Sequence, residues 1–195
     1  LIIIPGTKST IADLKFLKYQ GWDIDIKAHY RRGGSILGIC GGYQILGNEI
    51  IDDQGYDGTP SKAKGLGLLN VKTKMGKEKN LGKKEFISTI NGKKISGYEI
   101  HLGITSGSDC NNPFAILGNR KDGAISSNGL VMGTYLHGLF FSDEFRNNFV
   151  AKLSSEEKKE DISFHDSIEF ILEEFVRVIE DNLDVDSILS VARNI

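Results

Sequence analysis

The sequence is poor in the features that mark secreted, membrane-embedded or nucleic-acid-binding proteins. Its 195 residues include two cysteines, Cys40 and Cys110, too few for a disulfide framework, so a reducing, cytoplasmic setting is expected. No apolar run approaches the ~20 residues that span a bilayer, and no signal peptide opens the chain. A net charge of −2 leaves no basic field for nucleic acid, and no Cys/His/Asp cluster has metal-ligand spacing. We therefore predict no membrane, nucleic-acid or metal partner.

Hydrophobic residues make up 39% of the chain, enough for one sizeable core with a satellite element. The chain opens on an apolar run, residues 1–4, that is typical of a fully buried strand. A buried strand is an uncommon place for a true N-terminus, because termini usually lie at the surface. We expect this sequence to be a piece of a longer polypeptide.

The most informative stretch is Gly38-Ile39-Cys40-Gly41-Gly42. An apolar strand, residues 36–39, leads into it, and a helix-compatible run, residues 43–50, follows. This is the pattern of a nucleophile elbow with sulfur in place of oxygen. Glycines beside the nucleophile keep a tight turn free of Cβ atoms, and the helix start favours the thiolate. The alternative is a small buried cysteine in a glycine-rich turn.

The first fifty residues alternate between strand and helix, as in a mostly parallel α/β sheet. Helices are predicted over residues 9–20 and 23–32, between the strands at 1–4 and 36–39. Two loops, Pro5-Gly6-Thr7-Lys8-Ser9 and residues 40–42, then lie at carboxyl ends of strands. Open α/β sheets bind their ligands at that edge.

The middle of the chain predicts a smaller antiparallel region. Residues 52–58 are acidic and turn-forming, but they lack the full calcium-loop pattern and indicate a solvated loop. Residues 65–71 predict a strand, and the lysine-rich residues 72–84 predict a solvated loop, with contact to an anionic substrate as the alternative. Asn91-Gly92 between two β-prone runs predicts a hairpin with a type I′ turn.

Short strands and helices fill the remainder of the chain. Further strands are predicted at 114–117, 124–127 and 130–136, followed by a helix over 143–153. We set the domain at residues 1–153 and the tail at 154–195. The tail opens on a charge run, 156–161, and continues with helices at 165–181 and 185–192 that are expected to pack on the domain or a partner.

Two histidines are candidates for a base toward Cys40. His101 and His137 each follow a predicted strand, with a glycine close behind, in an exposed loop position where an imidazole can meet a cysteine. The residues by themselves do not choose between them.

Four segments together resemble the class I, triad-type glutamine amidotransferases, and more narrowly the branch of cobyric acid synthases and cobyrinic acid a,c-diamide synthases. The segments, in family order and spacing, are Pro5-Gly6-Thr7-Lys8-Ser9-Thr10, residues 33–44, Gly97-Tyr98-Glu99-Ile100-His101 and residues 133–140. The first of them, with Arg31-Arg32-Gly33-Gly34 before the elbow, favours the cobyric acid synthase side. The resemblance implies a flavodoxin-like α/β domain with a mostly parallel sheet flanked by helices, a small antiparallel region and a helical C-terminal tail.

The resemblance also implies roles. Cys40 attacks the side-chain amide of glutamine, and His137 serves as base and then as acid. Backbone N–H groups of Gly6 or Thr7 and of Gly41 hold the oxyanion. The adjoining substrate pocket is expected to be lined by Tyr98, Glu99 and His101.

One departure from the family pattern concerns the acid that orients the histidine. Class I enzymes usually carry His-x-Glu, whereas this chain has His137-Gly138-Leu139. Glu99, a backbone carbonyl or an acid from another domain could take that place. We expect that a partner domain completes the site, so that the isolated piece is a poor glutaminase.

The wider reaction rests on the resemblance alone. No G-x-x-x-x-G-K-[ST] loop occurs in these residues, so ATP and Mg²⁺ are expected in an upstream synthetase domain of the same chain. Ammonia released at Cys40 would pass to that domain and amidate carboxylates of a corrinoid in vitamin B12 synthesis. The alternatives are the glutaminase of a related amidating enzyme, such as cobyrinic acid a,c-diamide synthase or lipid II isoglutaminyl synthase, and a non-catalytic scaffold with the same fold.

Overall fold

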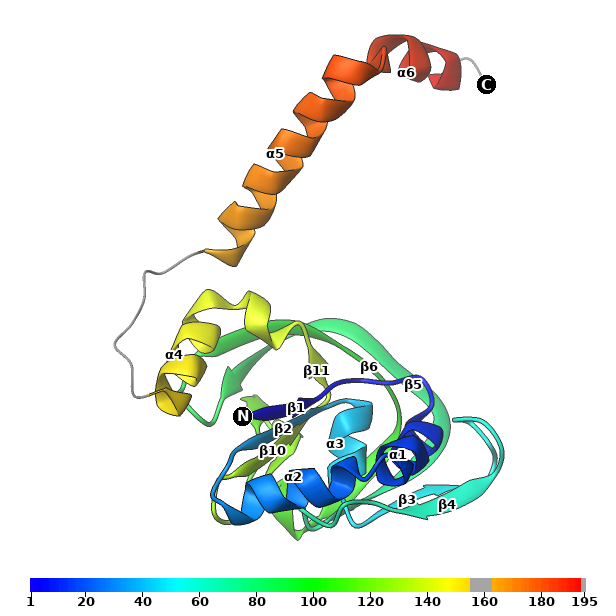
Figure 1. Ribbon diagram of the computed structural model, residues 1–195, viewed down its shortest axis with the longest axis vertical. Helices are drawn as coiled ribbons and strands as arrows, with labels where there is room; N and C mark the ends of the chain where they lie inside the picture. Colours follow the sequence, from blue (N-terminus) through cyan, green and yellow to red (C-terminus); the bar gives the residue numbers. More distant parts are fainter. Residues whose placement is uncertain (155–162, 194–195) are drawn as a thin grey trace. The chain divides into compact units, whose positions relative to one another are not determined.

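The computed structural model describes residues 1–154 and 163–193, with side chains described for all of these except residues 78–81, 83 and 84. The chain divides into two compact units, Leu1–Glu156 and Glu157–Ile195. The charge run predicted at 156–161 lies outside the described residues. Figure 1 shows the elements of both units in chain order.

The first sheet of the larger unit carries the cysteine. Its strand order is β1 (Ile2–Ile4), β2 (Ile36–Ile39), β10 (Val131–Thr134) and β9 (Ala124–Ile125), with the first three parallel. Helices α1 (Thr10–Tyr19), α2 (Trp22–Arg31) and α3 (Gly41–Leu46) connect or follow these strands, and α1 and α2 lie side by side in Figure 1. The alternation predicted for the first fifty residues is confirmed, and so is the α/β fold class.

Strand β2 is apolar throughout because both of its faces are covered. Ile36 and Leu37 are fully buried, yet they belong to different clusters of core side chains. Ile36 packs in the cluster that contains Tyr43, and Leu37 packs in the cluster that contains Phe145. A strand that separates two cores has no polar face, which explains its unbroken hydrophobic run.

The second sheet is larger than the sequence predicts. It joins, in this order, β11 (Leu136–His137), β6 (Lys94–Gly107), β5 (Val71–Ser88), β3 (Glu49–Asp52) and β4 (Ser61–Lys64). Strand β7 (Ala115–Leu117) pairs with β5, and β8 (Arg120–Asp122) pairs with β7. The long curved pair β5 and β6 dominates Figure 1.

Three predictions for the middle of the chain are wrong. Residues 72–84 belong to strand β5 and not to a loop, since backbone pairing with β6 holds this lysine-rich stretch extended. Residues 65–70 form an irregular loop whose backbone N–H groups hydrogen-bond to carbonyls at the end of α3, and the strand begins at Val71. The helix after the elbow stops at Leu46, because residues 49–52 are recruited as strand β3 between β4 and β5.

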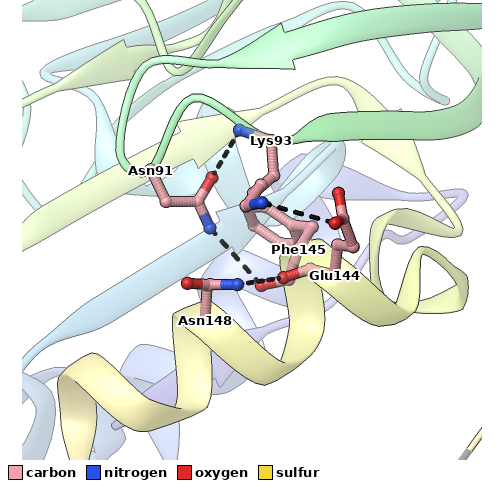
Figure 2. A network of polar contacts seen from close by, with 5 residues as sticks. All are labelled: Asn91, Lys93, Glu144, Phe145 and Asn148. Atoms are coloured by element: carbon pink, nitrogen blue, oxygen red, sulfur yellow. Dashed lines mark hydrogen bonds and ion pairs between the residues drawn. The ribbon is translucent and has the colours of Figure 1, made fainter.

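The predicted hairpin exists, but its turn is not type I′. Such a turn needs positive φ at both central residues, and Cys40 is the one non-glycine residue with positive φ in the described chain. Four residues link Ser88 to Lys93, the Ser88 N–H donates to the Lys93 carbonyl at 2.9 Å, and of these four linking residues only Gly92 has a positive φ, of 70°. The Asn91 side chain forms hydrogen bonds with Lys93 and with Phe145 of the following helix, as Figure 2 shows.

The hairpin end is fastened to helix α4 (Asp143–Leu153). Asn91 accepts from the Lys93 backbone N–H at 3.1 Å and donates to the Phe145 carbonyl at 3.5 Å, while the Lys93 ammonium lies 3.3 Å from Glu144 (Figure 2). Within the helix, Asn148 donates to the Glu144 carbonyl at 2.8 Å. These contacts hold the hairpin against the helix that follows β11 and the turn η2 (Leu139–Phe141) in the chain.

The smaller unit consists of α5 (Phe164–Asn182) and α6 (Val185–Arg193), close to the predicted helices. Ser163 caps α5 by accepting a hydrogen bond from the Asp166 N–H at 3.2 Å. The expectation that this tail packs on the domain stays a prediction.

Candidate active site

Cys40 lies in a strained turn between β2 and α3. Its φ of 53° and ψ of −110° fall outside the regions that a residue with a Cβ prefers. The turn depends on its glycines: a Cβ on Gly42 would lie 2.0 Å from the carbonyl oxygen of Ile4, and one on Gly38 would lie 2.6 Å from Leu46. The elbow predicted from the sequence is therefore present in the backbone.

Three strand ends meet at this cysteine. A Cβ on Gly6, which follows β1, would lie 2.9 Å from Cε1 of His137 and 3.4 Å from Cβ of Cys40. A Cβ on Gly41 would lie 2.5 Å from Cγ2 of Thr7 and 3.1 Å from its backbone nitrogen. The loop after β1 thus packs directly on the elbow, with the Thr7 backbone against Gly41, whose own N–H hydrogen-bonds to Cys40.

The backbone carbonyl of Ile100 faces both Cys40 and His137. The Cys40 thiol donates to it at 3.3 Å, and the His137 ring also hydrogen-bonds to it, which raises the pKa of the imidazole. Nε2 of His137 is buried without a partner among the described residues, which leaves Nδ1 as the bonding nitrogen. Tyr98 stacks on the His137 ring with centroids 5.2 Å apart.

Burial keeps both reactive groups neutral. It lowers the pKa of His137 below the ordinary 6.5, outweighing the Ile100 hydrogen bond. It raises the pKa of the Cys40 thiol above 9.0, and the Gly41 N–H opposes this by stabilising the thiolate. A neutral imidazole next to a neutral thiol can take its proton, so the pair is suited to nucleophilic attack.

His101 occupies a different place. Its ring stacks on Tyr135 with centroids 3.7 Å apart, and Nδ1 is buried without a partner among the described residues. Burial lowers its pKa, while the charge of Glu99 raises it. His101 lines two cavities, one with Cys40 and one with Glu99, so it stands in the wall between them.

Glu99 is not beside Cys40. Its carboxylate is buried and lies 2.5 Å from the Arg120 guanidinium, and it lines the second cavity, of about 220 Å³. Among the three ways to orient His137, the hydrogen bond geometry favours the backbone carbonyl, that of Ile100.

The cavity at Cys40 has a volume of about 260 Å³. Of the residues predicted for the site, it is lined by Thr7, Cys40, Gly41 and His101. Gly6 and His137 lie next to Cys40, and Tyr98 contacts the site through its stack on His137. The structure thus brings together all the predicted residues except Glu99.

The prediction missed Gln44. Its side chain is buried, accepts from the Thr10 hydroxyl at 3.2 Å, and donates to the Leu102 carbonyl at 3.2 Å and the Tyr135 hydroxyl at 3.1 Å. It therefore joins α1, β6 and the strand end before His137 beneath the cavity. Its position four residues after Cys40, on the same helix face, was the available signal.

The prediction also missed Lys8 and Asp57, which line the Cys40 cavity. Asp57 comes from the loop 52–58, which was expected to be solvated, whereas its Asp52 is fully buried. No local pattern shows that this loop, remote in sequence, reaches the cysteine.

Within residues 1–154 and 163–193, no group of three or more metal-ligating side chains is found, and no helix is long and apolar enough to cross a membrane.

Comparison with known proteins gives a consistent result. The family profile of the CobB/CobQ-like glutamine amidotransferase domain matches residues 1–145. Cobyric acid synthases of Cereibacter sphaeroides and Bradyrhizobium diazoefficiens are 48% and 49% identical over 193 residues, 99% of this chain. That of Ruegeria sp. is 46% identical over 195 residues, 100% of this chain.

This chain spans about 40% of the length of each of these relatives. A crystal structure of a glutamine amidotransferase superposes with a TM-score of 0.54 at 20% identity, covering 77% of both chains, and supports the fold.

Proposed function

The chain belongs to the CobB/CobQ-like glutamine amidotransferase family, and we propose that it is the glutaminase part of a cobyric acid synthase. The observation that carries this proposal is the position of Cys40, in a cavity that Thr7 and Gly41 also line, with the His137 ring packed against the neighbouring Gly6. The names of the relatives, at 45–49% identity across nearly the whole chain, support the choice of enzyme.

In the proposed mechanism, Nε2 of His137 takes the Cys40 proton as sulfur attacks the amide carbon of glutamine. The carbonyl oxygen becomes an oxyanion, which the N–H groups of Thr7 and Gly41 stabilise. His137 returns the proton to the amide nitrogen, and the C–N bond breaks. Ammonia departs, and Cys40 remains bound to the substrate as a γ-glutamyl thioester. Water, deprotonated by His137, then displaces sulfur and releases glutamate.

In this mechanism the Ile100 carbonyl orients His137, as the Glu of the usual His-x-Glu pattern does in class I enzymes. A hydrogen bond from Nδ1–H fixes the tautomer that presents Nε2 to the thiol. At rest the thiol also donates to this carbonyl, at 3.3 Å, and must turn to Nε2 before it reacts. Glu99 remains paired with Arg120 and takes no part in the proton transfer.

The acceptor and the energy source lie beyond these residues. Ammonia is delivered to a synthetase part that uses ATP and Mg²⁺ to activate carboxylates of a corrinoid in the cytoplasm. The greater length of the relatives supports such a part, since this chain spans 40% of them.

The test uses the enzyme that carries this chain. In Cys40→Ala, glutamine-dependent amidation of the corrinoid should fall roughly 10⁴-fold or more, while amidation driven by added ammonium persists. The loss identifies Cys40 as the nucleophile, and the ammonium reaction shows that the synthetase part is intact. Unchanged glutamine-dependent activity would overturn the proposal.

A further inference from the structure

The Cys40 cavity carries two formal charges of opposite sign. Lys8, on the loop between β1 and α1, and Asp57, on the loop between β3 and β4, line it together with the elbow. Neither forms an ion pair with another described residue. Two charged side chains without an ion-pair partner in the described chain therefore line the cavity of the nucleophile.

The two loops are tied to each other. Asp57 accepts a hydrogen bond from the Ile11 N–H at 3.0 Å through Oδ2, and the Ser9 hydroxyl contacts its carbonyl at 3.5 Å. The buried Asp52 carboxylate receives the N–H groups of Tyr56 and Asp57 at 2.9 and 2.8 Å. Oδ1 of Asp57 accepts no hydrogen bond from the described residues, so a fixed carboxylate keeps one oxygen for a ligand.

We propose that Asp57 binds the α-ammonium group of the substrate and Lys8 its α-carboxylate, so that the cavity selects a zwitterionic amino acid. This inference rests on the proposed function, because that function places the side-chain amide at Cys40. Three carbon–carbon bonds of roughly 1.5 Å put the α-carbon about 4 Å from the reacting carbon, within a cavity of this size. A free amino acid satisfies both charges, whereas a glutamine within a peptide has neither group.

The probe is the diazoketone analogue of L-glutamine, which alkylates a thiolate with loss of nitrogen gas. Its rate of reaction with Cys40 should fall about 10- to 100-fold in Asp57→Asn and in Lys8→Met, the loss expected for one charged hydrogen bond. Iodoacetamide, which lacks both α-groups, should alkylate Cys40 at the wild-type rate in both variants. Asp57→Glu and Lys8→Arg should retain part of the preference for the analogue.

Matched controls come from nearby charges. Asp53, paired with Lys62 at 3.4 Å, and Lys15, exposed on α1, do not line the Cys40 cavity. Asp53→Asn and Lys15→Met should react with both reagents like the wild type.

Two truncated competitors assign each residue to one group. γ-Aminobutyramide keeps the ammonium group and glutaramate keeps the carboxylate. Asp57→Asn should weaken protection of Cys40 by γ-aminobutyramide and spare that by glutaramate, and Lys8→Met should do the reverse.

The outcomes separate the two claims. Wild-type rates with the analogue in both variants, or equal losses with analogue and iodoacetamide, would overturn the binding roles and leave the proposed function standing. A wild-type Cys40 that reacts with iodoacetamide and ignores the analogue would overturn the proposed function itself.

Discussion

The two sides of the active site hold their residues by different means. The parallel sheet and its loops contribute Cys40, Gly6, Thr7 and Gly41. At the glycines of this region a Cβ atom would lie only 2.0 to 2.9 Å from a neighbouring atom, so that only glycine fits the backbone there. His137 is held by long-range pairing: β11 pairs with β6, opposite Tyr98, and β6 pairs with β5. The nucleophile is thus positioned by close packing of its glycine-rich turn against β1 and the loop after it, and the base by strand pairing.

Asp122 joins the two sides. It lies in β8 of the second sheet, and its buried carboxylate accepts hydrogen bonds from the hydroxyl of Thr134, at the end of β10, and at 3.2 Å from the N–H of Tyr135, the next residue. Burial raises its pKa from 3.8 to about 6. The contact two residues before His137 therefore depends on pH.

The largest effect is expected from the two histidines, whose replacement tests whether His137 and not His101 is the base toward Cys40. His137→Asn should lower kcat/KM for glutamine hydrolysis about 10²- to 10⁴-fold, because a general acid–base is lost. His101→Asn should lower kcat/KM less than about tenfold, since the His101 ring stacks on Tyr135 in the cavity wall. In the wild type, activity should fall only below pH 6.5, because the pKa of His137 is lowered. Equal losses in the two variants would contradict the assignment.

A smaller effect is expected from the glycines of the Cys40 turn. Gly42→Ala should lower the free energy of unfolding by about 3 kcal/mol, because the new Cβ would lie 2.0 Å from the Ile4 carbonyl. Gly76→Ala is the matched control, since a Cβ there meets nothing within 4 Å. Urea unfolding of both variants measures the difference, and similar losses would mean that the elbow is not sterically fixed.

The smallest effect concerns the joint between the sheets. The folded state retains the Asp122 proton to about pH 6, whereas the unfolded state loses it near 3.8, so this group destabilises the fold as pH rises between those values. Asp122→Asn does not titrate. Its stability relative to the wild type should therefore rise from pH 4 to 7, by on the order of 2–3 kcal/mol. Thermal unfolding across that range measures it, and a constant difference would show that the pKa of Asp122 is not raised.

The sequence predicts the Cys40 turn well because the signals for this turn are local. An apolar strand, a cysteine and the flanking glycines lie within residues 36–42, and the backbone has the elbow they require. The roles of Cys40 and His137 came from the family resemblance and stay proposals. The family membership expected from that resemblance is confirmed.

The sequence predicts the second sheet poorly because pairing, not propensity, decides it. The lysine-rich strand β5 has little apolar signal of its own, and it is extended because β6 lies along it. Asp57 looked like part of a solvated loop, since nothing near it shows that Ile11 and Ser9 hold it at the cavity.

By itself the sequence determined the nucleophile's turn, since a Cβ at Gly38 would collide with Leu46 and with the backbone of Gly42, all within the same short segment. Only the tertiary structure decided what surrounds the sulfur. Ile100, His137, Lys8 and Asp57 lie on separate loops and strands, and strand pairing with loop-to-loop hydrogen bonds is what gathers them around Cys40.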